Sequence, residues 1–266
     1  MAPEADAIGA AEQLFFRLLT GDVGPDLSTA LNRSGFLLEK ITLARRVYNV
    51  LTEDPHKKSG RGFYVFAQKS CSRDILMVPH GFYDRHTRKI GLKLFTEGDF
   101  AAGVWNTVHR YGGAGRKASA VKETLNWDMA HLPDTFFVAF TRAFARAYPG
   151  GRLMQLHGFS PKKRESKSGE EAGLILSSGG PSPPAALVTL ARCLEKKVPG
   201  GVKVYPDEIR ELGGTRNVSG QTLHSMGHGG FVHLEMGPAL RRALKTDGVV
   251  RGRFLECILS KRGACP

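Results

Sequence analysis

The stretch from residue 75 to residue 95, ILMVPHGFYDRHTRKIGLKLF, places a polar turn between an apolar run and a helical pattern. The apolar run ILMV is typical of a β-strand that is buried on both faces. Beyond Thr87, the apolar residues Ile90, Leu94 and Phe95 recur at helical spacing. A buried strand followed directly by a helix is the unit from which sheets covered by helices are built.

The same unit recurs along the chain. We expect further strands at residues 63–68, 103–111, 152–159, 174–180, 201–205 and 229–236. We expect helices at residues 132–148, 183–197 and 237–244. This alternation predicts an α/β fold in which a mixed, mostly parallel sheet is sandwiched by helices.

The first 60 residues differ from the rest. Both AAEQLFFRLL (residues 10–19) and GFLLEKITLARRVYNVL (residues 35–51) suggest helices with one polar face. We therefore expect residues 1–60 to form a helical N-terminal extension and residues 61–266 to form the α/β domain. A chain of 266 residues that is 41% hydrophobic can bury a sizeable core.

No apolar run reaches the ~20 residues that a membrane-spanning helix needs. No basic segment precedes an apolar run near the start, so the sequence suggests a cytoplasmic protein, or a secreted or periplasmic one if a leader has been removed. The four cysteines lack the spacing of a zinc knuckle. Their disulfide state and the oligomeric state of the protein stay open.

The net charge is +13, from 38 basic and 25 acidic residues. Such an excess attracts anions, and the basic stretch SPKKRESK (residues 160–167) adds to it locally. The sequence contains no recognisable nucleic-acid-binding module. We therefore expect a small anionic substrate or an acidic peptide as the partner, and no nucleic acid.

Residues that could bind a metal, transfer a proton or stabilise an anion lie at or near the carboxyl ends of four predicted strands: His80, Arg110, His157 and Glu235. In open α/β sheets this edge is where binding sites lie. With Asp84, two of these residues form a set of nitrogen and oxygen ligands suited to zinc.

Each residue in this set has a chemical role in the prediction. One zinc ion held by His80, Asp84 and His157 would lower the pKa of water and polarise a carbonyl. Glu235 would move the proton of that water to a leaving nitrogen, and Arg110 would stabilise the oxyanion.

Other interpretations of these residues stay open. His80 could cap a strand, and Asp84 could be a turn residue or a helix N-cap. His86 competes with Asp84 for the place of second ligand. His157 could be a hydrogen-bonded core histidine, and Glu235 could face solvent from an edge strand.

The order of these motifs resembles that of the zinc carboxypeptidase superfamily, which includes the aspartoacylases and the succinylglutamate desuccinylases. HGFYDRHT is also similar to a segment of poly-γ-glutamate hydrolases, and its surroundings are similar to N-formylglutamate amidohydrolases. NTVHRY and DMAH are similar to the aspartoacylase stretch Asn…Arg-Tyr…Asp-Leu-Asn-Arg, and FVHLEMGPALRRAL resembles the late strand with the catalytic Glu. The resemblance covers roughly residues 62–245 and implies a zinc-carboxypeptidase-like fold, of the phosphorylase/hydrolase-like type.

The resemblance implies the same zinc ligands, with Asp84 one methylene shorter than the usual Glu. It also implies substrate contacts, for which we expect Asn106, Asp128, His131 and His233. The family's Asn-Arg pair for a substrate carboxylate is replaced here by Ala130 and His131. Exopeptidase activity is therefore less strongly implied than hydrolysis itself.

The sequence thus predicts a zinc-dependent enzyme, a metallopeptidase or amidohydrolase, that cleaves the amide bond of a peptide or an N-acyl amino acid. The alternative is a basic protein of the same fold that binds polyanions or nucleic acid without hydrolysis. A third possibility is a relative that keeps the fold and binds a ligand without turnover.

Overall fold

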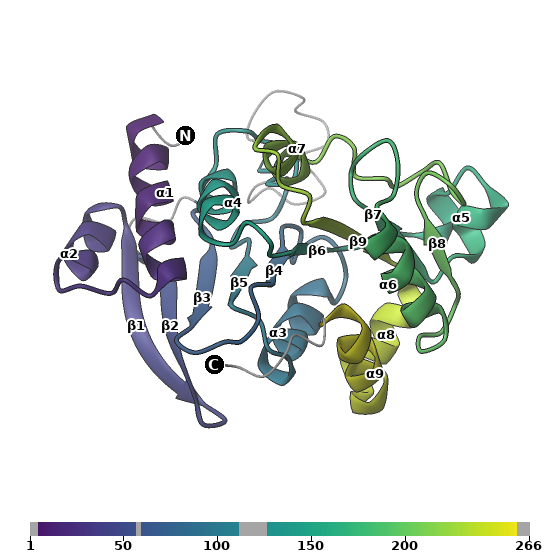
Figure 1. The fold of residues 1–266 in the computed structure, drawn as a ribbon, viewed down its shortest axis with the longest axis horizontal. Helices are drawn as coiled ribbons and strands as arrows, with labels where there is room; N and C mark the ends of the chain where they lie inside the picture. The colour runs from purple at the N-terminus through teal and green to yellow at the C-terminus, as the bar shows by residue number, and fades with distance from the viewer. Residues whose placement is uncertain (1–4, 57–59, 112–126, 260–266) are drawn as a thin grey trace.

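The computed structural model describes residues 5–56, 60–111 and 127–259. Nine strands of the described chain form one sheet, in the order β1-β2-β3-β5-β4-β6-β9-β7-β8 (Figure 1). The strands are β1 (Phe36–Leu43), β2 (Arg46–Glu53), β3 (Phe63–Ala67), β4 (Ile75–Val78), β5 (Ala102–Trp105), β6 (Leu153–Gly158), β7 (Leu174–Ser177), β8 (Val202–Val204) and β9 (Phe231–Met236).

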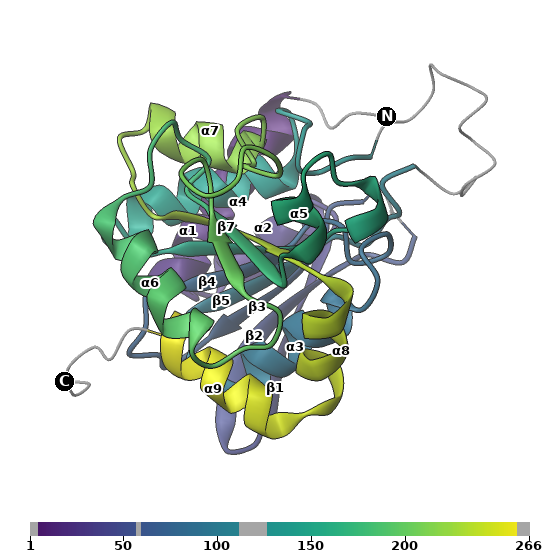
Figure 2. The same ribbon diagram turned by 90° about the vertical axis from the view of Figure 1, so that its right-hand side faces the viewer.

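Helices cover both faces of this sheet. One face carries α1 (Ala5–Thr20), α2 (Asp26–Arg33), α4 (Phe136–Ala147) and α7 (Val218–Ser225). The other face carries α3 (Thr87–Glu97), α6 (Ala185–Glu195), α8 (Pro238–Thr246) and α9 (Gly248–Ile258). A short helix, α5 (Lys167–Glu171), follows the 3₁₀ turn Pro161–Lys163. Figures 1 and 2 show α4 and α7 on one side of the strands and α3, α8 and α9 on the other.

Alternate residues of the central strands pack into the hydrophobic cores on the two faces of the sheet. In β4, Leu76 and Val78 join the core under α3, whereas Ile75 and Met77 join the core under α4. This period of two explains why β4 is apolar throughout, since both of its faces are buried. The predicted α/β fold with a mixed sheet between helices is confirmed.

The central strands β5, β4, β6 and β9 are neighbours and run parallel to one another. Their carboxyl ends therefore meet at one edge of the sheet. The only other parallel pair among the described strands is β7 with β8. Four pairs are antiparallel, so the prediction of a mostly parallel sheet is wrong, although the part that carries the candidate site is parallel.

The N-terminal residues correct a second prediction. Helices α1 and α2 are present, but residues 36–53 form a β-hairpin of β1 and β2 that extends the main sheet. The hairpin turns at Ala44 and Arg45, which both have positive φ. Two left-handed residues match the twist of paired strands, and the β-branched Ile41, Thr42 and Val47 favour strands.

A disulfide joins Cys193 of α6 to Cys257 of α9 across 64 residues of sequence. It ties together two helices on the same face of the sheet. None of the helices in the described chain combines the length and the hydrophobicity needed to cross a membrane.

Candidate active site

A tight turn after β4 folds Asp84 back toward His80. The backbone N–H groups of Tyr83 and Asp84 both donate to the carbonyl of His80, at 2.9 and 2.8 Å. The Thr87 hydroxyl then donates to the carbonyl of Asp84 at 2.7 Å. Thr87 is the first residue of α3. The segment is therefore a polar turn, and this turn brings two candidate ligands together.

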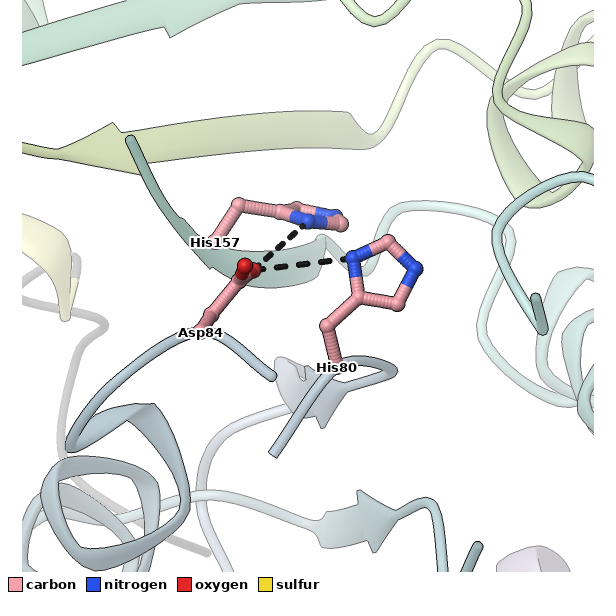
Figure 3. A group of neighbouring side chains, drawn as sticks. All are labelled: His80, Asp84 and His157. Atoms are coloured by element: carbon pink, nitrogen blue, oxygen red, sulfur yellow. Dashed lines mark ion pairs between the residues drawn. The ribbon is translucent and has the colours of Figure 1, made fainter. Parts of the chain in front are cut away.

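His157 completes the group from the end of β6. In Figure 3 the carboxylate of Asp84 faces a ring nitrogen of His157 and one of His80. Oδ2 of Asp84 lies 3.5 Å from Nδ1 of His80 and 3.4 Å from Nδ1 of His157. All three side chains are buried. Asp84 thus reaches the histidines despite its short side chain, and His86 is not part of the group that the three form.

In both histidines, the hydrogen bond at Nε2 determines whether Nδ1, the nitrogen that faces Asp84, carries a hydrogen. His80 donates from Nε2 to Oδ1 of Asp128 at 2.7 Å. His157 donates from Nε2 to the side-chain oxygen of Gln155 at 2.8 Å. These oxygens can only accept, so each neutral ring leaves an unprotonated Nδ1 that faces Asp84. Two nitrogen lone pairs and one carboxylate then converge on one point.

This donor set fits a zinc ion. Tetrahedral ligands that lie about 2.1 Å from zinc are about 3.4 Å apart, close to the separations of Asp84 from the two histidines. Lone pairs that face one another repel unless a cation or a proton lies between them. A carboxylate or carbonyl that holds the far nitrogen is the usual support of a metal-binding histidine. The residues present therefore fit the metal that the sequence predicts.

The same contacts shift the titration of the three groups. Burial would raise the pKa of Asp84, but its close contacts with the rings of His157 and His80 bring it well below its usual range. Burial opposes protonation of His80, but Asp128 and Asp84 raise its pKa. Burial lowers the pKa of His157 more than Asp84 raises it. Asp84 is thus anionic and His157 neutral at pH 7, as metal ligands must be.

Glu235 lies beside this group on β9, directly opposite His157 in the parallel pairing of β6 with β9. It is buried, and burial together with the charge of Asp84 raises its pKa to about 8. Oε1 of Glu235 lies 4.0 Å from Nε2 of His233. Burial and the neighbouring histidines hold the pKa of His233 well below its usual value.

His157, His233 and Glu235 form a second group with metal-ligand spacing. Both ring nitrogens of His157 are already committed, one to Asp84 and the other to Gln155. The two groups therefore describe one site with a shared histidine. Glu235 and His233 stay outside the proposed ligand set.

Arg110 does not stand free in the site. It lies five residues beyond the end of β5 and forms an ion pair with Asp128. Its guanidinium also lies over the rings of Tyr83 and Tyr111, at 5.0 and 5.5 Å from their centroids. It lines the cavity, but part of its charge is compensated before any substrate arrives.

Asp128 orients other site residues. Besides His80 and Arg110, it pairs with Nδ1 of His131 at 3.1 Å. His131 is 46% exposed and lines the cavity, where it is accessible to a ligand. Asp128 therefore holds three site residues in position, and its contact with substrate stays a prediction.

Asn106, for which a contact with substrate stays a prediction, holds the backbone beside the site. Its amide donates to the carbonyl of Pro79 at 2.9 Å, and its oxygen accepts from the N–H of Val108 at 3.0 Å. It is buried and does not line the cavity. Asn106 thus fixes the backbone immediately before His80.

The site opens into a cavity of about 730 Å³ that contains the three candidate ligands, Glu235, His233 and His131. Its basic lining consists of Arg85, Arg110, Lys163, Arg164, Arg216 and Arg241. Among the described residues, only two carboxylates line it, Asp84 and Glu235. Three residues could not be assigned from the sequence: Gln155, Arg241, and Asn217, whose side-chain amide donates to the side-chain oxygen of Gln155. Gln155, a polar residue inside an apolar strand, was the one signal in the sequence.

A comparison with protein-family models gives no match, and neither does a comparison with curated proteins. Among solved structures, a gene product of Agrobacterium tumefaciens is 11% identical, with a TM-score of 0.47 over 71% of this chain and 90% of that chain. A protein of Shewanella denitrificans, provisionally named carboxypeptidase A, is 10% identical (TM-score 0.43; 84% and 64%). An aspartoacylase family protein of Mesorhizobium loti is 12% identical (TM-score 0.41; 85% and 72%).

Proposed function

We propose that this protein is a zinc-dependent hydrolase that cleaves the amide bond of an anionic peptide or N-acyl amino acid. The observation that carries the proposal is the convergence of Nδ1 of His80, Nδ1 of His157 and the Asp84 carboxylate on one point. Their partners Asp128 and Gln155 leave these nitrogens unprotonated in the neutral rings. His80, Asp84 and His157 would hold one zinc ion.

Bound zinc supplies Lewis acidity, which lowers the pKa of water and polarises a carbonyl. Glu235 is the group that moves the proton. It would accept a proton from the attacking water and donate it to the nitrogen as the C–N bond breaks. In the metal-free protein, burial raises the pKa of this carboxyl to about 8, so it can both accept and release a proton near neutral pH. His233, which lies 4.0 Å from it, restricts its position.

The charge of the cavity supports an anionic substrate. Six basic residues line it, against two carboxylates. One of these carboxylates, Asp84, would be neutralised by the metal. A cavity with such a lining concentrates anions and repels cations.

The proposal is tested by metal analysis of the purified protein after dialysis. We expect about one zinc per chain in the wild type, and large losses in His80→Ala and His157→Ala. His224→Ala is the matched control, because His224 is exposed on α7 and outside the cavity. Turnover is then assayed on a panel of N-acyl amino acids and acidic peptides, with Glu235→Gln as the variant that keeps metal and loses activity.

A zinc content that is substoichiometric in the wild type and the same in both histidine variants would contradict the proposal. Zinc bound without hydrolysis across the panel would favour a ligand-binding protein without turnover. Salt-dependent DNA binding that survives chelation would instead favour the polyanion-binding alternative.

A further inference from the structure

Arg241 is a buried cation next to the candidate site. It lies in the first turn of α8, which begins directly after the strand that carries Glu235. Its guanidinium packs on the backbone of Gly158, where an added Cβ would come within 2.5 Å of Nη1. Gly158 follows the candidate ligand His157 and donates its N–H to Asp84 at 3.1 Å. Arg241 thus contacts a residue that is adjacent to one proposed metal ligand and hydrogen-bonded to another.

Backbone oxygens hold this guanidinium in place. Nη1 donates to the carbonyl of Arg85 at 3.1 Å, and Nη2 donates to the carbonyl of Phe159 at 2.9 Å. Nε is buried without a partner among the described residues. The residue is 8% exposed and lines the cavity. Its side chain is therefore fixed before a ligand binds.

The charge of Arg241 has no carboxylate partner within ion-pair distance in the described chain. The two other arginines of the cavity that are partly buried each have one, since Arg110 pairs with Asp128 and Arg164 with Glu211, whereas Arg85 and Arg216 are exposed. A buried charge without a counterion is costly, so such groups are usually paired. The counterion of Arg241 is therefore missing from the site, and an anionic substrate can provide it.

We propose that Arg241 binds a carboxylate of the substrate, so that the preferred substrate is an amide with a carboxylate a few atoms from the scissile bond. A planar guanidinium matches the two oxygens of a carboxylate. This inference rests on the proposed function. It names a residue on a different element from the Asn-Arg pair whose places are taken here by Ala130 and His131.

The test compares the binding of succinate, acetate and inorganic phosphate to the zinc-loaded protein by isothermal titration calorimetry. Acetate can occupy the metal alone, whereas succinate has a second carboxylate for Arg241. We expect succinate to bind more tightly than acetate to the wild type. Arg241→Gln should weaken succinate binding by roughly 10- to 100-fold, and remove the preference over acetate.

Arg216→Gln is the matched control, because it removes an exposed positive charge from the rim of the same cavity. It should change the affinities for succinate and acetate alike, by less than roughly 3-fold. Arg241→Lys keeps the charge and loses the planar fork, so it should also weaken succinate binding. If Arg241→Gln fails to fold, the succinate affinity of Arg241→Lys tests the proposal instead.

Zinc content and unfolding midpoint are measured on every variant. Normal zinc with a succinate affinity that does not depend on Arg241 overturns this inference and leaves the proposed function intact. Phosphate that binds more tightly than succinate in an Arg241-dependent manner overturns the assignment to a carboxylate. A wild type without zinc that still binds succinate through Arg241 sinks the proposed function and supports the anion site.

Discussion

His80 donates its Nε2 hydrogen to Asp128 over 2.7 Å, and the two side chains are only 4% and 6% exposed. Asp128 comes 48 residues later in the chain, after the end of β5. This buried bond decides which nitrogen of His80 is free to face Asp84. The site thus depends on a carboxylate that does not itself line the cavity.

Asp128→Asn should weaken zinc binding by roughly 10- to 100-fold, the usual effect of removing the partner of a metal-binding histidine. The amide is a weaker acceptor than the carboxylate, and it leaves Arg110 without its counterion. Competition with a chelator of known affinity measures the change. Asp134→Asn is the control, since Asp134 is exposed and lies two residues before α4. Equal zinc affinities in the two variants would contradict the positioning role of Asp128.

Glu235 makes the stability of the metal-free protein depend on pH. Its pKa rises from 4.5 unfolded to about 8 folded, so the folded state binds more protons between these values. The contribution of Glu235 to the free energy of unfolding therefore falls as pH rises from about 4.5 to about 8. Above pH 8 we expect Glu235→Gln to be more stable than the wild type, and near pH 4 the difference should vanish.

Urea unfolding of chelator-treated protein across this pH range measures the effect of Glu235. Glu170→Gln, which neutralises an exposed acid on α5, serves as the control and should follow the wild type at every pH. If Glu235→Gln instead loses stability relative to the wild type above pH 8, the carboxyl is not held in a costly buried position.

The disulfide between Cys193 and Cys257 should stabilise the fold independently of the site. A loop of this length lowers the entropy of the unfolded chain by an amount worth about 4 kcal/mol. Thermal unfolding of Cys193→Ser/Cys257→Ser should show a lower Tm with unchanged zinc content. The single variant Cys193→Ser should fall to the same Tm, since either change removes the bridge. An unchanged Tm in the double variant would contradict the link between α6 and α9.

The position of the site could be predicted because the carboxyl ends of neighbouring parallel strands lie at the same edge of a sheet. His80, His157 and Glu235 each follow or end an apolar run, and parallel neighbours place their carboxyl ends together. The choice of Asp84 over His86 could not be made from spacing. It depends on a turn in which His86 takes a left-handed conformation and precedes the helix.

Other residues were missed because their roles arise from contacts between distant segments. The bond from the amide of Asn106 to the carbonyl of Pro79 joins the ends of two neighbouring strands, and spacing in the sequence does not show it. Arg241 looks like any helical arginine in the sequence, and only its packing on Gly158 shows that it is buried. The prediction of a helix over residues 35–51 was wrong because a two-residue turn without glycine leaves little signal for a hairpin.

Gly158→Ala tests the placement of Arg241 without changing any charge. The new methyl group would meet the guanidinium at 2.5 Å, and because the side chain is held by two carbonyls it must shift as a unit. We expect a weaker succinate affinity in calorimetry, with the affinity for acetate retained. Gly229→Ala adds a methyl group where nothing lies within 4 Å and should behave as the wild type. Unchanged succinate binding in Gly158→Ala would mean that the anion site does not need Arg241 against this backbone.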